Sequence, residues 1–146
     1  MTLFKRAMSV ALLSLMCAPL TWSVAVASPV KVGLDVIEAS KTGRFIDPRL
    51  RKVTSTLRSS FPKYTSFKLV KSLHLALAQR ESQRVMLTKE LNAELTLESK
   101  GDQGSTLMIK VPQKKASIRV KSRRGGLFFQ AMRWKRKTYL LAVHGE

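Results

Sequence analysis

Residues 90–98 read ELNAELTLE, and this stretch decides the fold class because apolar and polar side chains alternate along it without interruption. A period of two residues is that of a β-strand with one buried face and one wet face. The turn-forming residues 101–104 (GDQG) follow, and apolar side chains alternate again over residues 107–111 (LMIKV). We therefore expect these two segments to pair as a β-hairpin.

The same short period recurs on both sides of this hairpin. Further strands are predicted at residues 30–36, 67–69, 73–77, 85–87, 116–120, 127–132 and 138–143. The first of these is expected to be half-exposed, with one face buried. Strands that recur every 8 to 12 residues or so, with turn residues between them, are typical of an antiparallel sandwich or a partly open barrel.

One long helix is predicted between the first two strands. Asp47 supplies an N-cap oxygen, and Pro48 suits the first helical position, where its missing N–H costs nothing. Leu50, Val53 and Leu57 follow at helical spacing before Phe61 and Pro62 end the pattern. The predicted fold class is thus α+β and mainly β: an antiparallel sandwich or partly open barrel with one amphipathic helix near the mature N-terminus.

The N-terminal segment has the organisation of a secretory signal peptide. Lys5 and Arg6 precede an apolar run over residues 7–20, and Ala25 and Ala27 supply the small side chains that a signal peptidase requires. The protein is therefore expected to be exported, either to the periplasm or to an extracellular or envelope-associated location.

Signal cleavage is predicted between Ala27 and Ser28. It divides the chain into a signal peptide, residues 1–27, and a single β-rich domain, residues 28–146. The alternative is an uncleaved anchor, because residues 7–27 are long enough to cross a bilayer.

The composition of the mature chain limits its chemistry. The 146 residues include 27 basic and 9 acidic side chains, and residues 28–146 keep 25 of the basic and all 9 acidic ones, for a formal charge of +16. The only cysteine, Cys17, lies in the predicted signal peptide. An intramolecular disulfide, a thiolate nucleophile and a cysteine-ligated metal site are therefore excluded from the mature chain.

The positive charge is concentrated toward the C-terminus, where eleven basic residues and no acidic one lie between Asp102 and Glu146. Most of them fall in three predicted strand connections, of which two are expected to meet at one edge of the sheet. The candidate polyanion-binding residues are Lys114, Lys115, Arg123, Arg124, Arg133, Trp134, Lys135, Arg136 and Lys137.

Such a basic surface attracts polyanions by Coulomb forces and by counterion release, and an aromatic ring such as Trp134 among the cations suits stacking or a membrane interface. The predicted partner is an anionic polymer or an anionic membrane surface, with nucleic acid a partner only outside the cell and an envelope protein a further possibility. The simpler interpretation is that the basic residues keep an exported β protein soluble and protect its edge strands.

A search for catalytic patterns finds none. His74 and His144 are the only histidines and lie in no recognisable motif, and Glu90, Glu94 and Glu98 share what looks like the wet face of one strand. No catalytic residue, metal ligand or cofactor is therefore predicted, and a non-enzymatic binding module is expected. The alternatives are a structural or interaction subunit of an envelope or secretion assembly and, less favoured, a hydrolase of envelope polymers.

Three short stretches carry a resemblance: residues 36–40 (VIEAS), 47–50 (DPRL) and 64–69 (YTSFKL). Together they are similar to a family of small exported proteins of unknown function from Gram-negative bacteria, over residues 32 to about 78. The resemblance implies a signal peptide, a short strand, a helix and a β-rich remainder. It implies no activity and no site residues.

Overall fold

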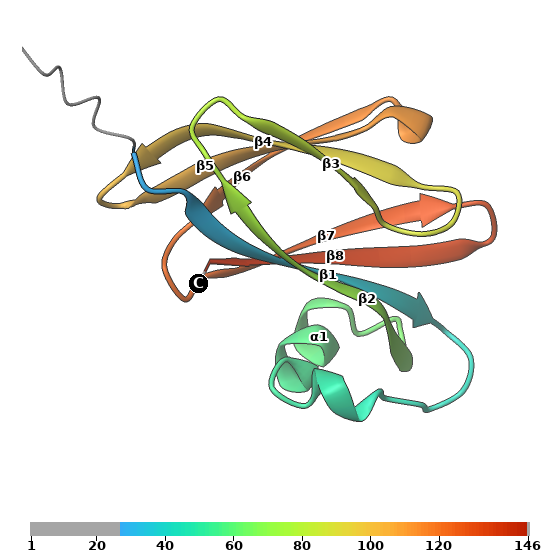
Figure 1. Cartoon of the computed structure of the whole chain (residues 1–146). Coiled ribbons are helices and arrows are strands. Elements are labelled where there is room, and N and C mark those ends of the chain that lie inside the picture. The colour runs from blue at the N-terminus through green and yellow to red at the C-terminus, as the bar shows by residue number, and fades with distance from the viewer. Residues whose placement is uncertain (1–26, 146) are drawn as a thin grey trace, which may run out of the picture.

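The computed structural model describes residues 27–145, in which eight strands are interrupted by short helical segments (Figure 1). The strands are β1 (Val30–Ser40), β2 (Ser66–Leu77), β3 (Ser82–Met86), β4 (Asn92–Gly101), β5 (Gly104–Val111), β6 (Ala116–Ser122), β7 (Leu127–Trp134) and β8 (Lys137–Gly145). The helical segments are the 3-10 helices η1 (Pro48–Leu50) and η2 (Pro112–Lys114) and the α-helix α1 (Thr54–Ser60).

The strands form two antiparallel sheets of four strands, with the orders β2-β1-β8-β7 and β3-β4-β5-β6. Each sheet stays open, so the sandwich alternative is confirmed and the barrel alternative is wrong. The two sheets pack on each other through one apolar cluster, in which Leu34 of β1, Leu95 of β4 and Leu141 of β8 are fully buried. The predicted hairpin is the pair β4 and β5, with Glu94 opposite Lys110.

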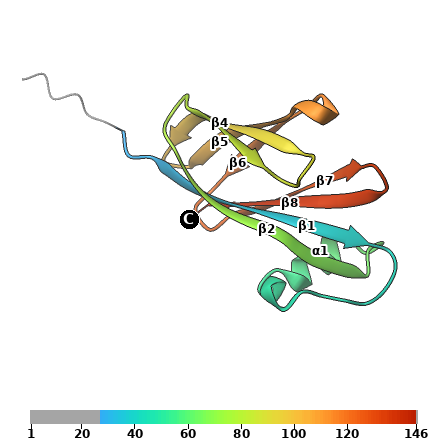
Figure 2. The ribbon, with the colours of Figure 1, turned by 45° about the vertical axis from the view of Figure 1, so that its right-hand side comes forward.

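A second apolar cluster lies on the outer face of the sheet that contains β1, where α1 and η1 cover one end of that face (Figure 2). Leu50 and Leu57 pack there against Ile37 of β1, Phe67 of β2 and Leu140 of β8. Over the predicted residues 30–36 one face is buried and the other includes the exposed Lys31 and the half-buried Asp35, as expected, but the strand is longer than predicted. β1 continues to Ser40 and contributes to both clusters, one on each face of its sheet.

β2 contributes side chains to both clusters because its apolar side chains move from one face of the sheet to the other partway along the strand. Ile37 is opposite Leu69 whereas Val36 is opposite Lys71, so Val70 is an extra residue that forms a β-bulge. Side chains alternate along a strand, and one inserted residue moves all later odd-numbered positions to the other face. The segments 67–69 and 73–77, predicted as two strands, are thus one strand with its apolar side chains on opposite faces.

The predicted helix near the mature N-terminus is confirmed but is shorter than expected, because residues 48–60 fold as η1 followed by the seven-residue α1. A turn over residues 51–53 separates them, and its last residue, Val53, has φ −113° and ψ 0°. The segment from Val53 to Thr56 consists of β-branched residues and a serine, which are weak helix formers. The Thr54 hydroxyl also donates to the Leu50 carbonyl at 2.8 Å. Apolar spacing located the buried side chains correctly and overestimated the length of the helix.

Asp47 fixes the start of η1 and is almost fully buried. Its carboxylate accepts hydrogen bonds from the Arg49 backbone N–H at 3.0 Å, the Arg49 Nη2 at 2.8 Å and the Leu69 N–H at 3.3 Å. The hydrogen bonds from the Arg49 side chain hold the pKa of Asp47 well below its usual range. A carboxylate with a lowered pKa stabilises the fold above its unfolded pKa of about 3.9, and this stabilisation is lost as the pH falls through its folded pKa.

Asp47→Asn is therefore expected to lower the melting temperature at pH 7 by on the order of 5 °C, because the amide replaces a charged acceptor. The difference from the wild type should shrink as the pH falls from about 4 to 2, because the Asp47 carboxylate of the unfolded chain becomes protonated there while that of the folded chain, with its lowered pKa, stays charged. Thermal unfolding followed by circular dichroism at several pH values measures both effects. Asp102→Asn, at an exposed turn, is the control. Parallel wild-type and Asp47→Asn curves over that pH range would contradict the assignment.

Candidate functional site

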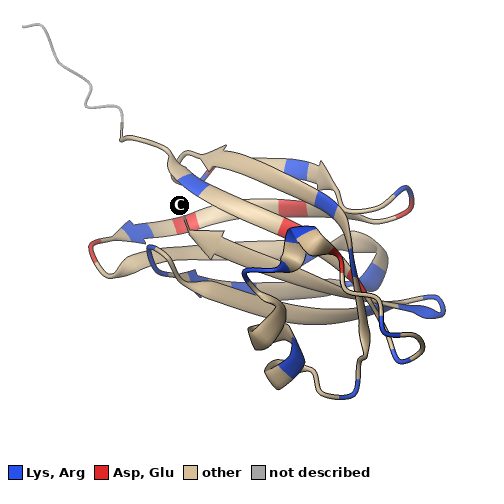
Figure 3. Ribbon diagram, turned by 90° about the horizontal axis from the view of Figure 1, so that it is seen from below, with Lys and Arg blue, Asp and Glu red and all other residues tan. Residues whose placement is uncertain are grey.

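The three basic strand connections are divided between the two ends of the sandwich (Figures 1 and 3). Lys114 and Lys115, between β5 and β6, lie at the same end as the β7–β8 hairpin, at the right of Figure 1. Arg123 and Arg124, between β6 and β7, lie at the opposite end, beside the C-terminus. The sequence-predicted basic residues therefore form two separate regions.

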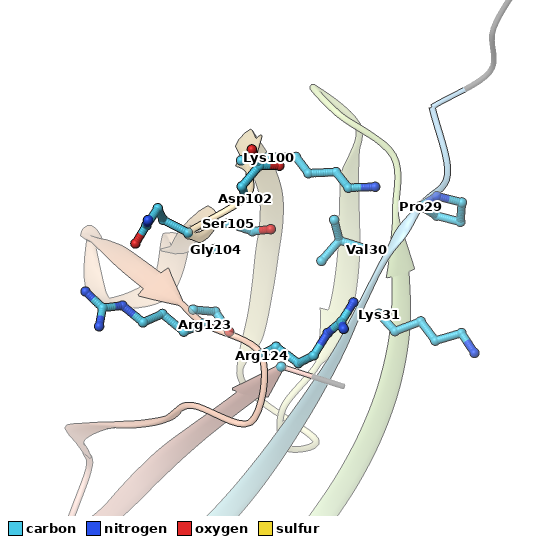
Figure 4. Close-up of a pocket in the computed structure, with 13 residues that line it drawn as sticks. Pro29, Val30, Lys31, Lys100, Asp102, Gly104, Ser105, Arg123 and Arg124 are labelled. Carbon is cyan, nitrogen blue, oxygen red and sulfur yellow. The ribbon is translucent and has the colours of Figure 1, made fainter.

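The end that contains Arg123 and Arg124 has an open cleft of about 770 Å³. It lies between the start of β1, the β4–β5 turn and the β6–β7 connection (Figure 4). We call it the basic cleft, because its charged lining consists of one acidic residue, Asp102, and four basic residues: Lys31, Lys100, Arg123 and Arg124.

The charge of the basic cleft, among the residues that the structure describes, comes from these four basic side chains and Asp102. Within residues 27–145 none of the four forms an ion pair with an acidic residue, and Lys100 Nζ donates to the Ser28 carbonyl at 2.9 Å. Figure 4 shows Lys100 and Arg124 extending toward Val30 from opposite sides, whereas Arg123 and Lys31 point outward. The cleft thus offers cations both in its interior and on its rim.

Gly104 allows the two turns of the basic cleft to approach each other. It has φ 132°, and a Cβ atom built on it would lie 2.5 Å from the Ser122 carbonyl oxygen and 3.3 Å from the Arg123 Cα. The β6–β7 connection is itself tight, since the Gly126 N–H donates to the Arg123 carbonyl at 2.8 Å. Glycine in the β4–β5 turn therefore brings Lys100 and the two arginines to one opening.

A second opening, of about 650 Å³, lies at the other end of the sandwich, beside the β7–β8 hairpin. We call it the tryptophan pocket. It combines apolar and aromatic side chains with charged ones, and its main lining residues are Glu38, Val70, Glu90, Trp134, Lys135, Lys137 and Tyr139.

Two of the four cations that line the tryptophan pocket are paired with carboxylates, whereas Lys89 and Arg136 form no ion pair among residues 27–145. Lys135 Nζ lies 2.6 Å from Glu90 Oε2, and Lys137 Nζ lies 3.1 Å from Glu38 Oε2. The hydrogen bond from Lys135 lowers the pKa of Glu90, and the hydrogen bond to Glu38 raises the pKa of Lys137. Two cations of the sequence-predicted hairpin are therefore paired with acids from β1 and from the β3–β4 connection.

The other predicted residues lie outside the basic cleft. Arg133 lines a smaller hollow of about 260 Å³ with Lys41 and Tyr64. Arg136 lines the tryptophan pocket, and Lys114 and Lys115 are exposed at the end of η2. Conversely, sequence reasoning missed Lys31 and Lys100, which lie far from the basic C-terminal segment in sequence.

A group of polar side chains on the outer face of the first sheet does not have the geometry of a catalytic relay. The Asp35 carboxylate accepts a hydrogen bond from the Ser72 hydroxyl and lies 3.6 Å from His144 Nε2. In a nucleophilic relay the imidazole lies between the hydroxyl and the acid, whereas here the acid lies between the other two. Within residues 27–145, no group of three or more His, Cys, Asp or Glu side chains is arranged to hold a metal ion.

Comparison with protein-family models, curated proteins and solved structures finds no match for this chain. The similarity of residues 32–78 to a family of exported proteins therefore stays a prediction. The predicted signal peptide, residues 1–27, lies outside the described residues except for Ala27, which is exposed, as is Ser28. Over residues 27–145 no helix is long and apolar enough to cross a membrane.

Proposed function

We propose that this chain is an exported, non-enzymatic module that binds an anionic polymer of the cell envelope through the basic cleft. One observation carries the proposal. Four basic side chains from three separate segments of the chain line one opening, and none of them is paired with an acidic residue among the described residues.

The physical argument is that unpaired cations in a concave site attract anions more strongly than the same cations on a flat surface, because the low-dielectric walls focus the field. Arginine adds a planar fork of donors that matches phosphate or carboxylate oxygens. The cleft volume falls within the range of sites for small ligands, so a short segment of the polymer would occupy it. The formal charge of residues 28–146, +16, would speed the encounter.

The test compares two variants that remove the same charge from opposite ends of the sandwich. The cleft variant is Lys100→Gln, Arg123→Gln and Arg124→Gln together; the control is Lys114→Gln, Lys115→Gln and Arg136→Gln together. The probe is a fluorescent single-stranded DNA, used as a soluble polyphosphate. We expect the cleft variant to bind about tenfold or more weakly at low salt, and the control to change much less.

The salt dependence gives an independent measurement. Each phosphate contact contributes about 0.7 to the slope of log K against log salt for a single strand, so losing three contacts should lower the slope by about 2. Equal losses in affinity and slope for both variants would show that net charge alone attracts the polyanion, and the basic cleft would then not be its site.

A further inference from the structure

We propose that the tryptophan pocket is a second binding site, which takes an uncharged sugar ring of a glycan. It lies at the opposite end of the sandwich from the basic cleft and uses different side chains (Figure 1). This inference is independent of the proposed polyanion binding, because it rests on apolar surface and on paired charges.

The pocket lies at the edge of the apolar interior of the sandwich, where polar side chains begin. Along the inner face of β1, Val32, Leu34 and Val36 are fully buried, and the next position on that face is Glu38. Tyr139 of β8 is opposite Glu38 and only 8% exposed. The aromatic ring and the carboxylate thus lie side by side at the edge of the core, which gives the pocket an apolar floor beneath a polar rim.

The β-bulge and the β7–β8 hairpin complete the apolar surface. Val70, the extra residue of the bulge, also lines the pocket and is 41% exposed. Trp134 packs partly against the core cluster, and its Nε1–H donates to Glu90 Oε2 at 3.1 Å. Because this hydrogen bond fixes the indole and occupies its only donor, the ring can offer a ligand its apolar surface alone. A ring held in place before binding loses little entropy when a ligand stacks on it.

The charged groups of the rim can hydrogen-bond hydroxyl groups. Glu38 and Glu90 are each paired with one lysine, and Lys89 and Arg136 add two cations without an ion pair among residues 27–145, so the rim offers both donors and acceptors. A paired carboxylate still has free lone pairs, and a paired ammonium still has free N–H groups, and both can hydrogen-bond hydroxyls. A purely apolar ligand would bury these groups without partners, which costs free energy.

A pyranose ring meets both requirements. It has a face of C–H groups that can stack on an aromatic ring and a rim of hydroxyls that can both donate and accept hydrogen bonds. The pocket volume of about 650 Å³ is within the range for a ligand of this size.

The first experiment follows the indole directly. The chain has two tryptophans, so the full chain carrying Trp22→Phe reports on Trp134 alone. The probes are cellotetraose, maltotetraose and N-acetylated chitotetraose. We expect at least one of these sugars to produce a saturable fluorescence change. Because the sugar is uncharged, the midpoint of the titration should move less than about twofold between low salt and 0.5 M NaCl. The absence of a saturable change with all three sugars would overturn the proposal.

Variants assign the sugar to this pocket, with binding measured by titration calorimetry. Trp134→Ala should weaken binding more than about tenfold, Trp134→Phe by a smaller factor because a ring remains, and Glu90→Gln several-fold because the indole loses its charged anchor. Phe45→Ala, a 55% exposed aromatic outside the pocket, is the control and should leave the affinity unchanged. Unchanged affinity in both Trp134→Phe and Glu90→Gln would refute the assignment even if Trp134→Ala fails to fold.

The triple glutamine variant of the basic cleft separates this proposal from the first. It should bind the neutral sugar as the wild type does while losing the polyphosphate. Loss of sugar binding in that variant would place the sugar in the basic cleft and remove the reason for a second site.

Discussion

Replacing Phe67 with alanine is expected to lower the free energy of unfolding by about 3–5 kcal/mol. The Phe67 ring is completely buried in the cluster where α1 and η1 cover the sheet, and Leu50, Leu57 and Leu140 belong to the same cluster. Truncation removes the transfer free energy of the ring and leaves a cavity that the surrounding β-strands cannot fill. Because domains of this size have total stabilities of about 5–15 kcal/mol, the loss is a large fraction of the whole.

Chemical denaturation monitored by circular dichroism measures this change. Phe45→Ala is the matched control, since Phe45 lies two residues from Asp47 on the same connection and is 55% exposed. Its effect should stay within about 0.5 kcal/mol. A loss below about 1.5 kcal/mol for Phe67→Ala would mean that the helical segment and the sheet are loosely packed, contrary to the buried cluster described above.

Gly104→Ala is the second substitution with a large expected effect, a loss of about 2–5 kcal/mol of unfolding free energy. Two costs add together. Alanine rarely adopts φ 132°, and its Cβ atom would lie 2.5 Å from the Ser122 carbonyl oxygen, which belongs to the backbone and cannot move aside cheaply. Relief of that contact must displace the β4–β5 turn from the β6–β7 connection. We therefore also expect weaker polyphosphate binding under conditions where the variant remains folded.

Gly125→Ala separates these two costs, because Gly125 also has a positive φ, 69°, but no atom lies within 4 Å of the added Cβ. It should cost only about 1–2 kcal/mol, from backbone strain alone. Equal destabilisation by the two substitutions, measured by denaturant unfolding, would show that the close approach of Gly104 to Ser122 is unimportant for the fold.

The strands could be predicted because each carries its own signal, the alternation of apolar and polar side chains. The alternation over residues 90–98 corresponds to one buried and one half-exposed face of β4. The bulge at Val70 has no such local signal: residues 67, 69, 73, 75 and 77 are all apolar and odd-numbered, so they read as a single face. Which face each of them occupies depends on pairing with β1, and therefore on tertiary structure.

The candidate site was predictable only in part, for a related reason. The sequence identified Arg123 and Arg124 as part of a basic connection, and the structure places them in the basic cleft. Lys100 could have been added, because alternate connections of an antiparallel meander lie at the same end, and its turn is two connections before theirs. Lys31 comes from another sheet, and its position could not be inferred without knowing how the sheets pack.

The pairing of two lysines of the β7–β8 hairpin with carboxylates could not be predicted from the sequence. Lys135 and Lys137 belong to a segment with no acidic residue, so they count as free cations in any local sum of charge. Their partners, Glu90 and Glu38, precede them by 45 and 99 residues, and only strand pairing and sheet packing bring them together. Charge counted along a sequence thus locates basic side chains but does not tell which of them remain unpaired.

Pro29 and Gly145, near the two ends of the described chain, both line the basic cleft. This arrangement matters for laboratory work, since an affinity tag or a surface linker joined directly to Pro29 or Gly145 would start at the lining of the cleft that contains Arg123 and Arg124. A polyhistidine or acidic tag there changes the local charge and blocks access, so an immobilised protein can give a false negative result. Attachment in the β5–β6 connection, at the far end of the sandwich, leaves the opening accessible.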